Sequence, residues 1–177
     1  KAIALAGDVN GDGYADFLVG LPDAAGGAGR ALLFLGGATP DGTADLTLTG
    51  SAAGDTFGAA LAGLGDTNGN GYADFAAGAP GADGDTGQVR LFLGAASLCA
   101  TAAATFNGDT FGLRFGAALT GAGDVNGDGY TELAVAAPAY SASTGRLYLF
   151  HGGVGGPDIS TDAIRTGSAA GDRFGAA

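Results

Sequence analysis

Apolar residues in this chain come in short runs that are separated by segments rich in Gly, Asp and Ser. In the middle of the chain, residues 57–65 and 74–80 are two runs of small apolar residues, and 89–93 begins with apolar and polar residues in alternation. Runs of this length between turn residues are typical of β-strands rather than helices. A fourth, outer strand is expected around 102–106, so the pattern favours an all-β fold.

The same order of segments occurs three times. The nine-residue loop Asp8–Asp16 returns as Asp66–Asp74 and as Asp124–Glu132, with starts a constant 58 residues apart. Single residues outside the loops keep the same interval: Pro22, Pro80 and Pro138; Gly29, Gly87 and Gly145; Phe34, Phe92 and Phe150. Four strands per repeat of this length are typical of β-propeller blades.

We therefore expect β-propeller blades, in the form of three four-stranded antiparallel repeats of about 58 residues each. Residues 1–177 are treated as a single partial propeller. Its approximate repeats are 1–56, 57–114 and 115–173, with 174–177 starting a further strand.

Each nine-residue loop carries oxygen side chains at positions 1, 3, 5 and 9, with a backbone carbonyl at position 7 and a glycine at position 6 for the sharp turn. An all-oxygen set favours Ca²⁺ over Zn²⁺ or copper, and six or seven flexible ligands favour it over Mg²⁺. Water would complete each sphere. The expected metal ligands are Asp8, Asn10, Asp12, Asp16 and the Tyr14 carbonyl; Asp66, Asn68, Asn70, Asp74 and the Tyr72 carbonyl; and Asp124, Asn126, Asp128, Glu132 and the Tyr130 carbonyl.

Two other interpretations of these loops fit the sequence less well. Asp, Asn and Gly also form simple Asx-turns, but turn formation does not require oxygen ligands at four fixed offsets in three copies. An EF-hand needs flanking helices and a Glu at position 12, where this chain has Val19, Ala77 and Val135. Calcium is the remaining interpretation, with three sites, and the second is expected to be the weakest because Asn70 replaces an acid.

Charge and composition exclude several classes of partner and of protein. The chain has 7 Lys and Arg against 18 Asp and Glu, a net charge of −11, which argues against nucleic acid and anionic lipid as partners. A 46% hydrophobic fraction with 14% charged residues is too apolar for a disordered chain. No apolar run approaches the length of a membrane span, so no membrane insertion is expected.

Short motifs at fixed places around the loops resemble the FG-GAP repeat family, which forms the blades of integrin α-subunit propellers and of related bacterial and fungal propellers. Phe57-Gly58 and Gly78-Ala79-Pro80 bracket the second loop, and Phe115-Gly116 and Ala136-Ala137-Pro138 bracket the third. Gly20-Leu21-Pro22 follows the first loop, and Phe174-Gly175 opens a further copy. The resemblance covers essentially the whole chain.

The resemblance implies that the Ca²⁺ loops join the first two strands of each blade on the lower face, that the metal is structural, and that partners bind the opposite face. By position, that face would be built from the turns at 23–29, 50–56, 81–87, 107–114 and 140–145. The third copy departs from the pattern. There, 112–115 aligns with Gly54-Asp55-Thr56-Phe57, and the Asp of the motif is displaced into the preceding segment.

Three blades are too few to close a propeller of this family, which has about seven. Ala176 and Ala177 align with the same strand positions as Lys1 and Ala2, so the tail of one copy can meet the head of another. Either two chains form a six-bladed homodimer, with 174–177 completing the partner's first blade, or this chain is a piece of a longer propeller. Unpaired sheet edges favour assembly.

The residues with potential chemistry do not form a catalytic set. His151, the sole histidine, is expected to be a strand-end substitution, and Cys99 a buried small hydrophobe. Arg114 and Arg173 share an aligned place before Phe-Gly, where packing or solvation is expected.

We therefore expect no enzyme but a Ca²⁺-binding, non-catalytic module for recognition or adhesion, with a protein or glycan ligand. It would act at the cell surface or in the extracellular space, where millimolar Ca²⁺ suits such sites. An accessory or lectin-like propeller domain of a secreted hydrolase is the alternative, and a purely structural scaffold is a third possibility.

Overall fold

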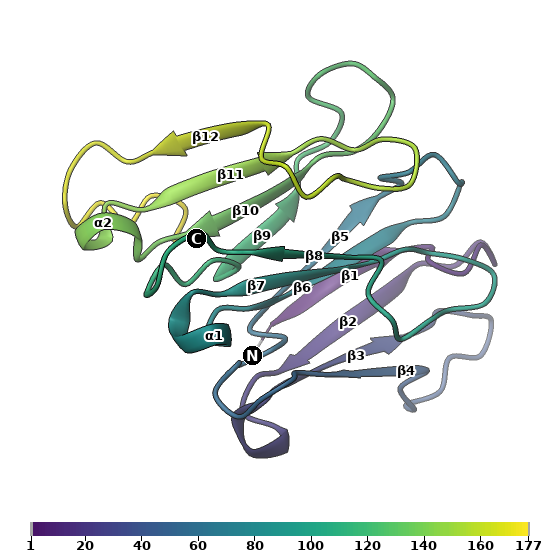
Figure 1. Ribbon diagram of the computed structural model, residues 1–177. Helices are drawn as coiled ribbons and strands as arrows, with labels where there is room; N and C mark the ends of the chain where they lie inside the picture. Colours follow the sequence, from purple (N-terminus) through teal and green to yellow (C-terminus); the bar gives the residue numbers. More distant parts are fainter. Residues whose placement is uncertain (1, 177) are drawn as a thin grey trace.

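The chain folds into three four-stranded antiparallel sheets that lie side by side, as a computed structural model describing residues 2–176 shows (Figure 1). In every sheet the spatial order of the strands follows their order in the chain. The prediction of an all-β fold made of propeller blades is confirmed. The sheets do not close into a ring, which is consistent with an incomplete propeller.

The strands keep the same arrangement from blade to blade. The first blade contains β1 (Ile3–Gly7), β2 (Asp16–Leu21), β3 (Arg30–Phe34) and β4 (Leu46–Thr49). The second contains β5 (Ala60–Gly65), β6 (Asp74–Ala79), β7 (Gln88–Phe92) and β8 (Ala104–Asn107). The third contains β9 (Ala118–Gly121), β10 (Leu133–Ala137), β11 (Arg146–Phe150) and β12 (Ala163–Thr166).

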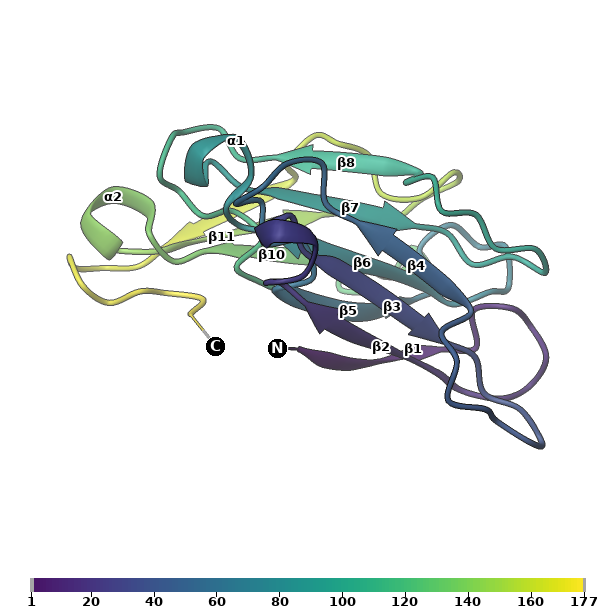
Figure 2. The same cartoon turned by 90° about the horizontal axis from the view of Figure 1, so that it is seen from below.

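Short helical turns connect the second strand of each blade to the third. They are the 3-10 turn η1 (Ala25–Gly27) and the single-turn helices α1 (Ala82–Asp85) and α2 (Tyr140–Ser143). Because the strands are antiparallel, these turns lie at the opposite strand ends from the loops that join first and second strands (Figure 2).

The repeat period sets the strand register. Phe17 pairs with Phe34 across β2 and β3, and Phe75 pairs with Phe92 across β6 and β7. The rings of these two pairs are stacked, with centroids 4.9 and 5.2 Å apart. Aromatic pairs across neighbouring strands stabilise a sheet, so the phenylalanines help to hold equivalent strands in equivalent register.

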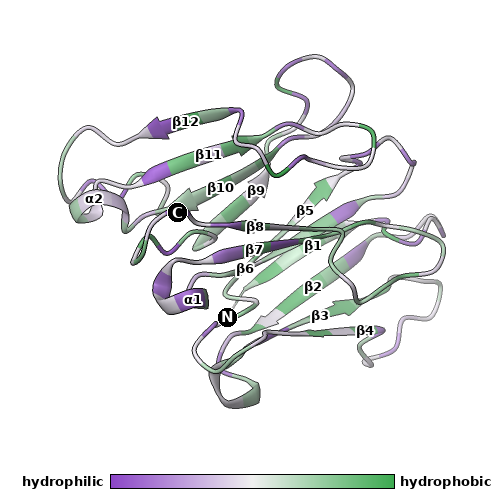
Figure 3. Cartoon of the chain, in the orientation of Figure 1, coloured by the Kyte–Doolittle hydropathy of each residue, from purple (hydrophilic) through white to green (hydrophobic). Residues whose placement is uncertain are grey.

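The hydrophobic core lies between the blades. One cluster joins first-blade residues such as Leu18 and Leu33 to Phe57 and Phe75 of the second blade, and another joins Phe106 of the second blade to residues of the third. Hydrophobic residues line strands such as β2, β5 and β9, whereas α1 is hydrophilic (Figure 3). Stability therefore depends on stacking, because each blade buries its apolar faces only against a neighbour.

Phe57 and Phe115 fix the junctions between blades. Each is buried, and each pairs through a parallel bridge with a glycine of the preceding blade, Gly29 and Gly87 respectively. The first strands β1, β5 and β9 also lie next to one another. The Phe-Gly (FG) motif, Phe57-Gly58 or Phe115-Gly116, thus anchors the start of one blade to the third strand of the blade before it, and we call this contact an FG junction.

Cys99 is exposed, so the prediction that it is a buried small hydrophobe was wrong. The residue lies in the loop between β7 and β8. Its neighbour Leu98 packs against the core instead. The backbone N–H of Thr101 donates to the Cys99 Sγ at 3.4 Å, and this hydrogen bond holds the pKa of the thiol below its usual value.

Candidate metal centre

The three acidic loops lie on one side of the blade stack, each between the first and second strands of a blade. Their first aspartates organise them in the same way. In the first loop, Asp8 Oδ1 accepts the backbone N–H of Gly11 at 2.7 Å, and its Oδ2 accepts that of Gly13 at 2.8 Å. Asp66 and Asp124 accept the equivalent glycine amides at 2.6–2.9 Å. Each loop is therefore wrapped around the carboxylate at position 1.

The oxygens at positions 3 and 5 each accept a backbone N–H two residues further on. Asn10 Oδ1 accepts from Asp12 at 3.1 Å, and Asp12 Oδ1 accepts from Tyr14 at 2.9 Å. The second and third loops repeat both bonds, through Asn68, Asn70, Asn126 and Asp128. Since an oxygen acceptor has more than one lone pair, these side chains are positioned by the backbone and retain capacity for a cation.

Position 9 is buried, and in the first two loops it ties the loop to the end of the third strand. Asp16 accepts the N–H of Val9 and of Gly36, each at 2.7 Å. Asp74 accepts the N–H of Thr67 at 2.9 Å and of Gly94 at 2.8 Å. Burial raises the pKa of both carboxyls, although these hydrogen bonds offset part of the rise.

The third loop has a longer acid, Glu132, at this buried position. Its Oε2 accepts the N–H of Val125, but its Oε1 is buried with no hydrogen-bond partner in the described part of the chain. The carboxylate oxygens of Asp124, Asp128 and Glu132 lie within 4.8 Å of one another, the one such acidic group of three within residues 2–176. A buried carboxylate oxygen without a donor is costly unless a cation neutralises it, so these residues fit a hard, oxygen-preferring metal.

Hydrogen bonding also favours the charged form of two position-1 aspartates. The amide of Gly129, followed by that of Gly127, holds the pKa of Asp124 below its usual value. Burial raises the pKa of Asp66, but the amides of residues 68–71 outweigh that effect and the pKa is lowered. Both carboxylates are ionised at neutral pH, so a cation would not need to displace a proton from them.

Neighbouring loops contact one another. A Cβ atom placed on Gly11 would lie 2.6 Å from the ring of Tyr72, and one on Gly69 would lie 2.9 Å from the ring of Tyr130. The N–H of Ala73 also donates to the carbonyl of Asp8 at 3.0 Å. The tyrosine of one loop thus covers the glycine of the loop before it. In the third loop, no described atom lies within 4 Å of the equivalent position on Gly127.

On the face opposite the loops, the third repeat differs in structure at the place where its sequence lacks the Asp of the motif. Asp55 accepts the N–H of Ser51 at 2.9 Å and of Ala52 at 2.8 Å, which closes the turn before Phe57. Leu113 takes this place in the third copy and is buried in the core. The displaced segment at 107–112 instead presents Phe111, whose exposed fraction is 79%.

Two residues singled out in the sequence show simple surroundings. His151 follows β11, with its Nδ1 3.6 Å from the Asp162 carboxylate. Arg114 Nε lies 3.8 Å from Asp85 Oδ1.

Among the described helices, none is long and apolar enough to cross a membrane.

Four-stranded antiparallel blades, stacked through FG junctions and each carrying an oxygen-rich loop between its first two strands, define an incomplete β-propeller. The family model described as FG-GAP repeat matches residues 2–34, 57–92 and 115–150, which is more than half of the chain. The chain belongs to the FG-GAP repeat family.

Similar proteins include integrin subunits. Human integrin alpha-X is 57% identical over 47 residues, 27% of this chain and 4% of that protein. Integrin alpha-PS2 of Drosophila melanogaster is 59% identical over 46 residues, 25% of this chain and 3% of that protein. Mouse integrin alpha-M is 54% identical over 39 residues, 22% of this chain and 3% of that protein. The matched segments thus span a small part of these relatives.

Proposed function

We propose that the chain is a Ca²⁺-binding, non-catalytic recognition or adhesion module that acts at the cell surface or in the extracellular space. The unpartnered Oε1 of Glu132, in a group with Asp124 and Asp128, is the observation that carries the calcium part of this proposal. Likeness to integrin alpha subunits supports the adhesion part. The ligand, a protein or a glycan, would bind the face opposite the loops.

Calcium would serve a structural role in this module. The loops begin at Asp8, Asp66 and Asp124, and three Ca²⁺ ions would bring the net charge from −11 to −5. Because the loops contact one another through Tyr72 and Tyr130, an ion in one loop would also help to order its neighbour. The second site would be the weakest, since Asn70 contributes no charge.

The exchange Glu132→Gln tests the calcium proposal through two opposite effects. Loss of a negative charge is expected to weaken Ca²⁺ binding at the third loop by about tenfold, as followed by isothermal titration calorimetry. In EDTA the same variant should melt at a higher temperature than the parent, because the neutral amide removes a buried carboxylate charge.

Two further variants make the titration specific. Glu132→Asp keeps the charge and restores the residue of the other loops, so its affinity should stay within about threefold of the parent. Asn70→Asp should strengthen the second site, which tests the ranking. If Glu132→Gln bound Ca²⁺ as tightly as Glu132→Asp, the third loop would not be a calcium site.

We also propose that further blades complete the ring, from a second copy of the chain or from a longer protein. On the first blade, Ile3 and Leu5 have exposed fractions of 78% and 77%, and Phe17 of 39%. The equivalents of Ile3 and Phe17 on the second blade, Leu61 and Phe75, are buried in the core that the first two blades share. The first blade thus exposes an apolar face, whereas the equivalent face of the second blade is buried against the first blade.

Light scattering tests which blades complete the ring. A six-bladed homodimer predicts a mass close to twice 16.8 kDa in Ca²⁺ and a shift toward the single-chain mass in excess EDTA. The shift is expected because the loops lie beside the strands that form the junctions between blades. A mass of one chain in both buffers would contradict the homodimer and leave a longer propeller as the explanation.

A further inference from the structure

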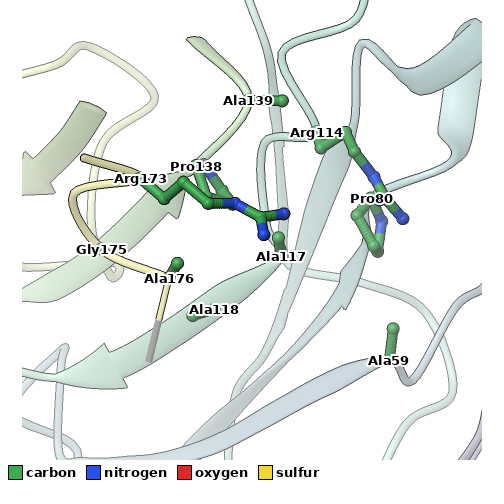
Figure 4. A pocket seen from close by; sticks show the side chains of 10 residues that line it. All are labelled: Ala59, Pro80, Arg114, Ala117, Ala118, Pro138, Ala139, Arg173, Gly175 and Ala176. Carbon is green, nitrogen blue, oxygen red and sulfur yellow. The ribbon is translucent and has the colours of Figure 1, made fainter. Parts of the chain in front are cut away.

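A pocket of about 320 Å³ opens between the second and third blades on the face opposite the acidic loops (Figure 4). Ala59 and Ala117 come just before β5 and β9, and Pro80 and Pro138 come just after β6 and β10. These are the strand ends farthest from the loops. Apart from two arginines, Arg114 and Arg173, the walls are made of alanine, glycine and proline.

The two arginines occupy the same place in successive repeats, and the same hydrogen bonds fix their backbones. The N–H of Arg114 donates to Asp85 O, and that of Arg173 donates to Ser143 O, each at 2.8 Å. The carbonyls of the two arginines accept the N–H of Ala117 at 3.1 Å and of Ala176 at 2.9 Å. Both side chains therefore start from well-defined turns on one face.

Both arginines also have a backbone conformation that residues other than glycine rarely adopt. Their φ angles are +57° and +51°, in the left-handed region that favours glycine and asparagine. The backbone geometry alone therefore gives no reason for arginine at these places. Thr56, at the equivalent place of the first junction, has φ +56°, so this conformation belongs to the repeat and the arginines need another reason.

The local charge is unusual for so acidic a chain. With 18 acids against 7 bases, the chain still places two guanidinium groups on one small pocket. The pair between Arg114 and Asp85 is 3.8 Å long with both side chains more than half exposed, so it is weak. Within residues 2–176, Arg173 forms no ion pair.

We propose that this pocket binds a carboxylate of an acidic protein segment. Guanidinium groups bind carboxylates through paired N–H donors. Figure 4 shows the guanidinium group of Arg173 near Ala117 and that of Arg114 near Pro80. The walls suit the short methylene stem of an Asp or Glu side chain. They offer no aromatic ring or side-chain hydroxyl for a sugar. This inference rests on the proposed recognition function and narrows its partner to a protein.

The test is an NMR titration of ¹⁵N-labelled protein in Ca²⁺. The probes are the peptide acetyl-Gly-Gly-Glu-Gly-Gly-amide and its counterpart with Gln in place of Glu. The Glu peptide should shift the Nε–Hε signals of Arg114 and Arg173 in a saturable manner, and the Gln peptide should not. In the double variant Arg114→Gln/Arg173→Gln, affinity should fall by at least about tenfold.

Three controls define the site. Arg165→Gln removes an exposed arginine of β12 outside the pocket and should leave affinity unchanged. The double variant Arg114→Lys/Arg173→Lys keeps both charges without the paired donors, so it should bind the Glu peptide with intermediate affinity. It replaces Arg114→Gln/Arg173→Gln if that variant does not fold. Calcium titration of each variant should match the parent, which separates a failure of the pocket from a failure of the calcium proposal.

Three results would overturn the inference. One is equal shifts from the Glu and Gln peptides. Another is unchanged affinity in a folded double variant. The third is tighter saturation by inorganic sulfate or phosphate than by the Glu peptide, which would make the pocket a site for an oxyanion ester instead.

Discussion

Replacing Gly87 with alanine is expected to break the junction between the second and third blades. Gly87 has φ +88°, and an added Cβ would overlap the backbone O and N of Phe115. Those atoms have little room to move, because the Phe115 N–H donates to Thr86 O at 3.1 Å and Gly87 pairs with Phe115. We expect a loss of about 3 kcal/mol or more in the free energy of unfolding, measured in urea.

Gly54→Ala is the matched control for this effect. Gly54 has a similar φ of +94°, but no atom of residues 2–176 lies within 4 Å of the position that a Cβ would take. This variant carries the strain of the left-handed conformation without the overlap and should lose about 1–2 kcal/mol. Equal losses in the two variants would show that the close approach at Phe115 does not hold the blades together.

Removing Ca²⁺ is expected to lower the melting temperature sharply. Without metal, the loops carry eight acids, among them Glu132 with its unpartnered buried oxygen. A ligand present at 100 times its Kd stabilises the folded state by about 2.7 kcal/mol per site. For a chain of this length, that corresponds to about 8 °C for each filled site.

The measurement is differential scanning calorimetry in Ca²⁺ and in excess EDTA. Mg²⁺ added in place of Ca²⁺ should restore less of the lost stability, because it requires tighter octahedral geometry. A melting temperature in EDTA within about 2 °C of that in Ca²⁺ would mean that the hydrogen bonds around Asp8, Asp66 and Asp124 suffice to hold the loops.

The blade architecture could be predicted from the sequence because a constant interval of 58 residues places equivalent strands and turns in three copies. The outer strand expected around 102–106 is observed as β8, Ala104–Asn107. Strand ends depend on pairing with a neighbour, which a single repeat does not reveal, so small differences of this kind are expected.

The distinct state of Glu132 could not be predicted from its place in the motif. It aligns with Asp16 and Asp74, which accept the amides of Gly36 and Gly94. The additional methylene group changes where the carboxylate lies, and its Oε1 accepts no such bond among the described residues. Only the packed loop shows that this oxygen is buried without a partner in the described part of the chain.

Features that depend on contacts between repeats were also missed. The sequence placed Arg114 and Arg173 at one aligned position but favoured packing or solvation, because it shows neither backbone angles nor the pocket between blades. The exposed Cys99 was missed for a related reason. Burial of a loop residue depends on whether a second sheet covers it, which composition does not indicate.

Calcium binding by the three loops is tested most directly by the number of Ca²⁺ ions bound per chain. Equilibrium dialysis against millimolar Ca²⁺ followed by elemental analysis gives this number without a structural assumption. We expect close to three ions per chain, with the second site the first to empty as the Ca²⁺ concentration is lowered. Binding of no Ca²⁺ at millimolar concentration would contradict this expectation and would leave the loops as metal-free Asx-turns.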